Sequence, residues 1–285
     1  MTTLIVPQRM DIQSLETEML ARVPRRPALQ EKVEVMVARW QEFCTLPEEV
    51  KARFGYSQDA RISGAGYELK RGTDGFDLKE DFHVRLDQES FLRAEADKVG
   101  APEAHRFLDA AVAVYPELDA LICDFLEDVE RVYGLSNLVS DAKAWNHRRI
   151  IRLLHYFGDK EPGMLLGDPH PDKGGFTTHL YESDPGVERL TVDGRYVPMD
   201  VEDGETLVFA GLGLQHRSRC AVKAPWHRIV ANERTARTGR VAAVSFSSMA
   251  NSRYYDKARV GRTQGLVPGS TYAMPFPEFD RMFMD

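Results

Sequence analysis

The second half of the chain contains a series of short runs that are rich in β-branched and aromatic residues and are separated by turn residues. Runs of this length, repeated about every 8–12 residues, are typical of strands in a sandwich or a barrel. The dipeptide Asp193-Gly194, between two of these runs, has the chemistry of a tight hairpin turn. The runs cover residues 149–157, 175–182, 187–192, 195–199, 205–210, 227–232 and 240–249. This half is therefore predicted to form a sandwich or a barrel.

The first half of the chain is predicted to be helical. Apolar residues recur at helical spacing within 29–44 and most regularly within 103–133. Pro116 lies inside the second of these segments, where it is expected to kink the helix or to split it in two. Residues 11–22 also have a helical pattern. The apolar stripe of each helix is expected to pack into the core.

These two halves predict a mixed α and β fold. Its core would be a double-stranded β-helix, or jelly roll, braced by N-terminal and central helices. We expect a helical region at 1–145, the jelly-roll core at 146–250 and a tail at 251–285, which together form one structural unit. The tail is irregular until the sequence PEFDRMFM near its end.

Composition narrows the class of protein. The net charge of −7 argues against a nucleic-acid partner, and the longest apolar runs are shorter than the ~20 residues that cross a bilayer. The N-terminus lacks the pattern of a secretory signal. Three widely spaced cysteines, Cys44, Cys123 and Cys220, fit neither a disulfide framework nor a CxxC metal site. A cytoplasmic monomer without a membrane partner is the resulting expectation.

A candidate metal site begins in the sequence GDPHPDKGGFTT. His170 and Asp172 are two residues apart, and residues at this spacing in a strand point to the same face. A third ligand has to come from elsewhere, and His227 begins a predicted strand, with His216 as a competitor. Two histidines and one carboxylate form the facial triad of non-haem Fe(II) oxygenases. For His155 and His179, which lie within predicted strands, a hydrogen-bonded structural role is expected.

Several motifs in order resemble the isopenicillin-N-synthase-like branch of the Fe(II)/2-oxoglutarate dioxygenases. They are FCTLPEEVKARF, GYELK and DLKEDFHV in the first half, then HPDKGGFTTHL, DPGVERL, DGRYVPM, GETLVFAGLGLQ, HRIV and RVAAVSF. The resemblance covers nearly the whole chain, although the family's usual first strand is shortened or missing. It implies that His170, Asp172 and His227 bind iron, with His227 preferred over His216.

The same resemblance implies a site for 2-oxoglutarate. Arg240, which opens RVAAVSF, matches the arginine that pairs with the far carboxylate of this cosubstrate, and Tyr156 matches a tyrosine that hydrogen-bonds it. Arg237 is the competing arginine, but Thr-Gly follows it instead of a strand pattern. Two positions depart from the family pattern: Ala242 replaces a Ser or Thr, and Leu154 replaces an Asn. Each departure removes a hydrogen-bonding side chain from the expected cosubstrate site.

The resemblance implies oxidation, most often hydroxylation, of a small organic molecule with O₂, with release of succinate and CO₂. Two alternatives stay open, namely an Fe(II) oxidase of the same family that does not use 2-oxoglutarate, and a non-catalytic jelly-roll binding protein. Zinc-dependent hydrolysis is a third, but it would leave Arg240 without a role. Arginines in the second half are compatible with a carboxylate-bearing substrate. The candidate substrate contacts are Tyr67, Arg219, Tyr254 and Tyr255.

Overall fold

A computed structural model describes residues 12–56, 64–70, 79–248 and 266–283. Its strands are β1 (Ala21–Pro24), β2 (Gly66–Lys70), β3 (Lys79–Val84), β4 (Ile150–Tyr156), β5 (Leu165–His170), β6 (Phe176–Glu182), β7 (Val187–Leu190), β8 (Tyr196–Pro198), β9 (Glu205–Ala210), β10 (His227–Val230) and β11 (Arg240–Ser247). Its α-helices are α1 (Ser14–Thr17), α2 (Pro27–Cys44), α3 (Glu48–Lys51), α4 (Glu89–Val99), α5 (Pro102–Tyr133), α6 (Leu138–Ala144), α7 (Leu212–Arg217), α8 (Thr235–Thr238) and α10 (Phe276–Phe283).

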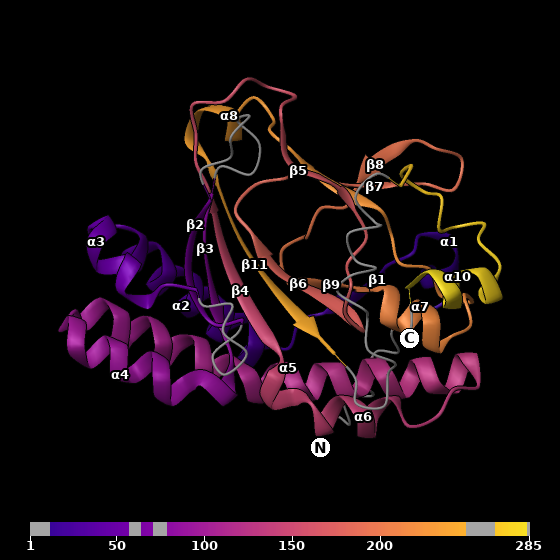
Figure 1. The fold of residues 1–285 in the computed structure, drawn as a ribbon, viewed down its shortest axis with the longest axis horizontal. Helices are drawn as coiled ribbons and strands as arrows, with labels where there is room; N and C mark the ends of the chain where they lie inside the picture. The colour runs from indigo at the N-terminus through magenta and orange to yellow at the C-terminus, as the bar shows by residue number, and fades with distance from the viewer. Residues whose placement is uncertain (1–11, 57–63, 71–78, 249–265, 284–285) are drawn as a thin grey trace, which may run out of the picture.

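The strands form two antiparallel sheets that face each other (Figure 1). The major sheet has the order β1-β9-β6-β11-β4-β3-β2, and the minor sheet has the order β5-β10-β7-β8. Consecutive strands along the chain alternate between the sheets at several points, which is the topology of a double-sheet jelly roll. The predicted fold class is confirmed.

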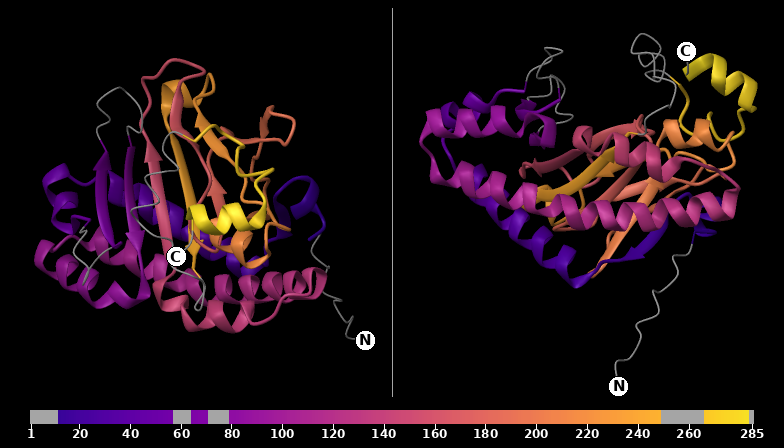
Figure 2. Two further views of the ribbon diagram at one scale, coloured as in Figure 1. Left: turned by 45° about the vertical axis from the view of Figure 1, so that its right-hand side comes forward. Right: turned by 90° about the horizontal axis from the view of Figure 1, so that it is seen from below.

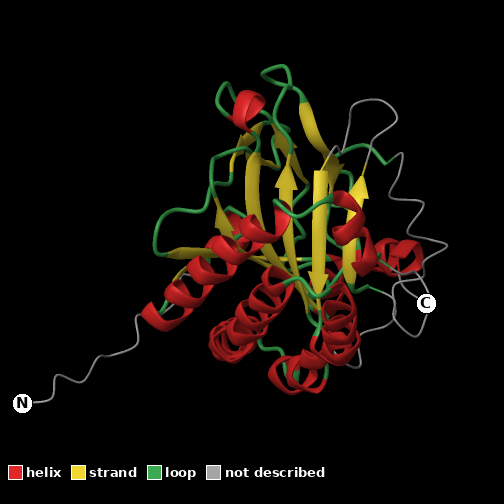
Figure 3. Cartoon of the chain, turned by 90° about the vertical axis from the view of Figure 1, so that its left-hand side faces the viewer, coloured by secondary structure: helices red, strands yellow, loops and turns green. Residues whose placement is uncertain are grey.

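Helices cover the outer face of the major sheet (Figures 2 and 3). The 18-residue α2 and the 32-residue α5 lie against each other and against this face. Between them and the sheet is an aromatic core in which Trp40, Phe43, Phe82 and Phe107 are all fully buried. Because the outer face of the sheet is filled in this way, the side chains on its inner face are the ones that line the space between the sheets.

Three local predictions were wrong or incomplete. Residues 11–22 do not form one helix: after α1, the segment extends into β1, because pairing with β9 buries Ala21 and Val23 on one face. This short β1 occupies an edge of the major sheet. Pro116 does not split α5, which is continuous. The elements α4, α6, α7 and β5 were not predicted.

Near the end of the chain, where the irregular part of the tail was expected to stop, residues Phe276–Phe283 form α10. This helix packs beside α7 through Phe279 and Phe283. Within the described part of the chain, no helix is long and apolar enough to cross a membrane.

Candidate metal centre and cosubstrate pocket

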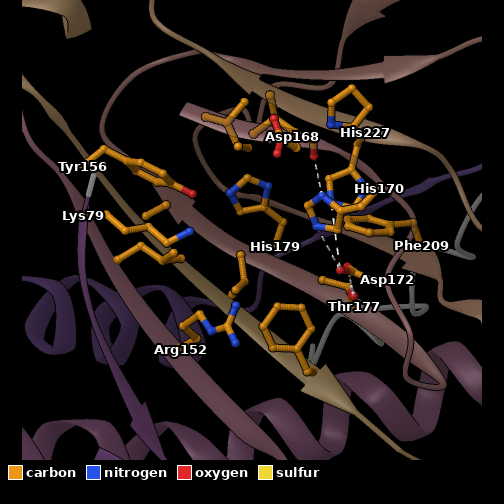
Figure 4. Close-up of a pocket in the computed structure, with 18 of the residues that line it drawn as sticks. Lys79, Arg152, Tyr156, Asp168, His170, Asp172, Thr177, His179, Phe209 and His227 are labelled. Atoms are coloured by element: carbon orange, nitrogen blue, oxygen red, sulfur yellow. Dashed lines mark hydrogen bonds and ion pairs between the residues drawn. The ribbon is translucent and has the colours of Figure 1, made fainter. Parts of the chain in front are cut away.

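The three predicted ligands lie together at the inner edge of the minor sheet (Figure 4). His170 ends β5 and His227 begins β10, and the two are direct partners in the ladder, with ring centroids 4.6 Å apart. Asp172 follows in the loop that leads to β6. Its Oδ1 lies 3.8 Å from Nε2 of His170 and 3.9 Å from Nε2 of His227. Two donor atoms on different strands thus converge on one carboxylate oxygen.

Each of the three candidate ligands uses one of its polar atoms in a hydrogen bond and keeps the other atom available for a metal. Nδ1 of His170 bonds to the carbonyl of Asp168 at 2.6 Å, and Nδ1 of His227 bonds to the carbonyl of Pro225 at 3.1 Å. Because a carbonyl only accepts, both Nδ1 atoms donate, and the lone pairs are on the Nε2 atoms. The hydroxyl of Thr177 donates to Oδ2 of Asp172 at 2.5 Å, which leaves Oδ1 available. Outer partners of this kind orient metal ligands.

The spacing fits a first-row metal ion. All three donor atoms lie within 4.8 Å of one another. An ion with bonds of about 2.0–2.2 Å can touch two donors up to about 4.4 Å apart, and both measured separations from Asp172 are shorter than that. Desolvation and then the neighbouring His227 lower the pKa of His170, although its side chain is 50% exposed. A neutral imidazole is the form that binds a metal.

A second group of ligand-type side chains lies on the outer face of the major sheet, at Cys44, Glu80 and His155. Its carboxylate is already engaged, since Glu80 accepts hydrogen bonds from Lys51 at 2.5 Å and from Tyr67 at 2.8 Å. Burial raises the pKa of the Cys44 thiol, which disfavours the thiolate that a metal needs. The first group is therefore the better candidate for a metal centre.

The ligands open into a cavity of about 630 Å³ between the sheets. The wall opposite them is formed by the inward-facing residues of β3, β4 and β11. The lining residues that matter below are Lys79, Arg152, Leu154, Tyr156, His179, Arg240, Ala242, Val244, Phe246 and Leu266.

Both predicted cosubstrate residues lie at one end of this cavity. Arg240, Tyr156 and Lys79 are direct partners across β11, β4 and β3. The Tyr156 ring lies between two cations, with Arg240 Cζ 5.8 Å and Lys79 Nζ 5.3 Å from its centroid. The guanidinium of Arg240 also donates to the carboxylate of Glu182 and to the carbonyl of Asp184, the latter at 2.9 Å. The competitor Arg237 is exposed in α8 and does not line the cavity.

The two residues that depart from the family pattern face the same cavity, two residues along β4 and β11 from Tyr156 and Arg240. Leu154 and Ala242 are paired across β4 and β11, and both line the cavity. They present only hydrocarbon there. The polar groups near this point come from residues that the sequence did not single out, namely Lys79 and Glu182.

His179 is also nearer to the site than expected. It lines the cavity and is 3% exposed, and within the described residues its Nε2 has no hydrogen-bond partner. Burial lowers its pKa well below the usual value, and Arg240 and His227 lower it further. The expected hydrogen-bonded role is still met at the other side of the ring, because His179 has a hydrogen bond with the backbone of Tyr181 that acts to raise its pKa. His155 also has the expected role, since its Nδ1 bonds to Glu80 at 2.8 Å.

Of the four predicted substrate contacts, the two that lie within the described residues, Tyr67 and Arg219, do not line the cavity. Tyr67 faces the helices, is 4% exposed and donates to Glu80, so a molecule in the cavity would not touch it. Alternation in β2 explains this, because Tyr67 shares the outer face with its ladder partner Phe82. Arg219 stacks on Phe276 of α10, 4.6 Å from its centroid, and does not line the cavity. Tyr254 and Tyr255 lie outside the described residues.

Sequence comparison gives no match: neither a family model nor a curated protein matches the chain. Solved structures do match. A full-length Neurospora crassa protein, in complex with α-ketoglutarate (2-oxoglutarate) and thymine, has a TM-score of 0.69 and 18% identity over 95% of this chain and 88% of that one. The rice dioxygenase for auxin oxidation has a TM-score of 0.68 and 21% identity over 94% and 91%. The corresponding Arabidopsis thaliana protein, in a 2-oxoglutarate complex, has a TM-score of 0.68 and 20% identity over 83% and 85%. The chain therefore has the fold of the 2-oxoglutarate-dependent dioxygenases.

Proposed function

We propose that this protein is an Fe(II)- and 2-oxoglutarate-dependent oxygenase that oxidises, most simply by hydroxylation, a small organic molecule with O₂. The observation that carries the proposal is the His170, Asp172 and His227 group at one side of a cavity whose far end holds Tyr156 and Arg240. Iron held by that group would supply the activation of O₂ that couples oxidation of 2-oxoglutarate, to succinate and CO₂, with oxidation of the substrate.

The residues of the cavity would bind the metal and the cosubstrate in separate places. Asp172 would contribute the negative charge and His170 and His227 the two imidazole ligands of an iron ion held beside the cavity. Arg240 and the hydroxyl of Tyr156 would hold the distal carboxylate of 2-oxoglutarate. Lys79 adds a second positive charge beside Tyr156. This charge offsets the hydrogen-bonding side chains that Leu154 and Ala242 do not provide.

Glu182 decides how much charge Arg240 can offer. Burial raises the pKa of Glu182, against the opposing effect of Arg240. A protonated Glu182 would leave the guanidinium charge to the cosubstrate carboxylate. An ionised Glu182 would satisfy Arg240 by itself, and this pair is the observation that favours the second candidate function, an iron oxidase that does not use 2-oxoglutarate.

The substrate is proposed to be a small molecule, as it is in the related structures that bind thymine or oxidise auxin. Bound thymine in one and auxin oxidation in the other indicate that this fold accepts different small molecules. A monomer in a reducing compartment remains our expectation for the chain, whose three cysteines are free.

The test is anaerobic addition of Fe(II) and then 2-oxoglutarate to the purified protein. A charge-transfer absorption band is expected, because a 2-oxo acid that binds iron through two oxygens produces one. Arg240→Met should weaken 2-oxoglutarate binding about 10- to 100-fold, the usual effect of losing a hydrogen bond to a charged group. Arg237→Met is the matched control and should not change it. Iron binding without the band would reject 2-oxoglutarate as cosubstrate and support the oxidase.

A further inference from the structure

Arg152 is a positively charged residue in the wall of the cavity, and it has no role in the reaction proposed above. It lies on β4 and faces the cavity on the same side of the strand as Tyr156 (Figure 4). Its ladder partner on β11 is Val244, which in turn pairs with His179 on β6. Arg152 is thus two strands from His179, or about 10 Å at normal strand spacing.

Along the direction of the strands, Arg152 lies close to the candidate metal ligands and far from Arg240, the proposed partner of the cosubstrate carboxylate. The ligand Asp172 is bound by Thr177, whose ladder partner on β11 is Phe246. Arg240 lies four residues before Val244 on the same strand, or about 13 Å away at 3.3 Å per residue. A cosubstrate that extends from the metal to Arg240 therefore leads away from Arg152. The guanidinium is left beside the part of the cavity where a substrate would lie.

The guanidinium is held in place by its neighbours. Nε donates to Nε2 of His83 at 2.5 Å, and Cζ lies 4.8 Å from the centroid of the Phe246 ring. Burial, and then the charge of Arg152, lower the pKa of His83 to about 4, so this ring is a neutral acceptor. Asp81, which is fully buried, lies 3.2 Å from the same His83 nitrogen. Burial alone would raise the pKa of Asp81, but His83 and then the charge of Arg152 lower it.

These contacts use only one edge of the guanidinium. Within the described part of the chain, the Nη atoms of Arg152 have no hydrogen-bond partner. A fixed, planar pair of donors is the geometry that binds a carboxylate through two parallel hydrogen bonds. Beside it, Val244, Phe246 and Leu266 present an apolar surface to the cavity.

From these observations, we infer that the substrate is a small monocarboxylic acid with an apolar body, and that Arg152 is the residue that binds its carboxylate. The inference rests on the proposed function, because it takes the cavity as the place of oxidation. The carboxylate would occupy the Nη edge of Arg152, and the hydrocarbon part would lie against Phe246 and Leu266. Arg152 would thus select acids over their neutral analogues.

The experiment compares acids with amides of the same shape. Phenylacetate and hexanoate are titrated, alongside phenylacetamide and hexanamide, into the protein loaded anaerobically with Fe(II) and 2-oxoglutarate. Binding is followed by the change in the charge-transfer band and by the shift in unfolding temperature. At least one acid is expected to bind about 10-fold or more tightly than its amide. Arg152→Gln should abolish this difference and Arg152→Lys should keep part of it.

Arg148→Gln is the matched control, since Arg148 is exposed and stacks on Trp145 outside the cavity. It should retain the preference for acids. Equal binding of acid and amide by the unchanged protein, a preference that survives Arg152→Gln, or a loaded protein that binds none of the acids would each overturn the inference. Absence of the band itself would instead reject the proposed function. The temperature shift would still report whether acids are preferred.

Discussion

At the scale of single residues, the partner of each histidine determines its role. His216 bonds through Nε2 to Asp280 at 2.7 Å and packs against Phe276, so this nitrogen is occupied. His227 uses Nδ1 for the Pro225 carbonyl and directs Nε2 toward Asp172. Both side chains were possible distal ligands in the sequence. Only His227 has the nitrogen and the neighbours that a metal needs.

We therefore expect His227→Ala to abolish stoichiometric Fe(II) binding and His216→Ala to leave it intact. The expected loss exceeds the roughly 10- to 100-fold effect that removal of an outer-shell partner produces. Anaerobic titration with Fe(II), read by calorimetry, measures both variants. Circular dichroism of each variant checks that the fold is retained. Loss of iron from His216→Ala, with His227→Ala unaffected, would reverse the assignment.

Thr177 has a supporting role that can be tested separately. Its hydroxyl holds Oδ2 of Asp172, which fixes the direction of Oδ1. Thr177→Val keeps the shape of the side chain but removes this hydrogen bond, and should weaken Fe(II) binding about 10- to 100-fold. Thr177→Ser keeps the hydroxyl and should bind nearly as well as the unchanged protein. Equal affinity in the valine and serine variants would show that the hydrogen bond does not orient the ligand.

The site residues that could be predicted from the sequence are those that lie close together along the chain, whereas the others are brought together by strand pairing. His170 and Asp172 are two residues apart in sequence, so their spacing pointed to a shared site, although only His170 lies in a strand and Asp172 follows in the loop after β5. Arg152, His179 and Lys79 line the cavity because β4, β6 and β3 are near each other in the sheet, and that order depends on long-range pairing. No local pattern contains this information.

At the scale of elements, alternation along β3 separates two chemical environments. Lys79 lines the cavity, whereas Glu80 and Phe82 face the helices. Glu80 there accepts hydrogen bonds from Lys51, Tyr67 and His155, and so connects β2, β3, β4 and α3. Burial alone would raise the pKa of Glu80, but the hydrogen bonds from His155, Lys51 and Tyr67 lower it to about 2.

This shift predicts a pH-dependent contribution to stability. Because the pKa of Glu80 in the folded state is lower than its usual value of 4.5, its contribution is complete above pH 4.5 and is lost as the pH falls toward 2. The size is about 3 kcal/mol at neutral pH. Glu80→Gln should lower the free energy of unfolding by at least that amount, since Lys51 would also lose its buried partner.

Urea unfolding at several pH values measures the effect, with the exposed Glu49→Gln as control. The difference between Glu80→Gln and the unchanged protein should shrink between pH 4.5 and the lowest pH at which the protein folds. A constant difference across that range would contradict the assigned pKa.

Sequence patterns predicted the long elements better than the short ones. α2 and α5 have many turns of apolar repeat, and α5 tolerates Pro116 because the rest of its apolar face packs on the sheet. Residues 21–24 have too few positions to separate helix from strand, and their pairing with β9 decides the outcome. Short elements such as α7 depend on tertiary contacts in the same way.

At the scale of the whole molecule, the metal site joins the two sheets. His170 and His227 belong to the minor sheet, whereas Asp172 is fixed by Thr177 of the major sheet. An ion that binds all three ligands therefore connects two layers that separate on unfolding. Because the unfolded chain does not hold the three ligands together, the binding free energy adds to the stability of the folded state.

Fe(II) should accordingly raise the unfolding temperature under anaerobic conditions. At a free Fe(II) concentration 100 times the dissociation constant, the gain is about 2.7 kcal/mol. For a chain of this size that corresponds to a rise of about 4–5 °C. A chelator should reverse the rise, and differential scanning calorimetry measures it. His227→Ala should remove the increment and His216→Ala should keep it, since only His227 belongs to the candidate ligand group. An equal increment in both variants would mean that iron stabilises the protein from somewhere other than the junction of the two sheets.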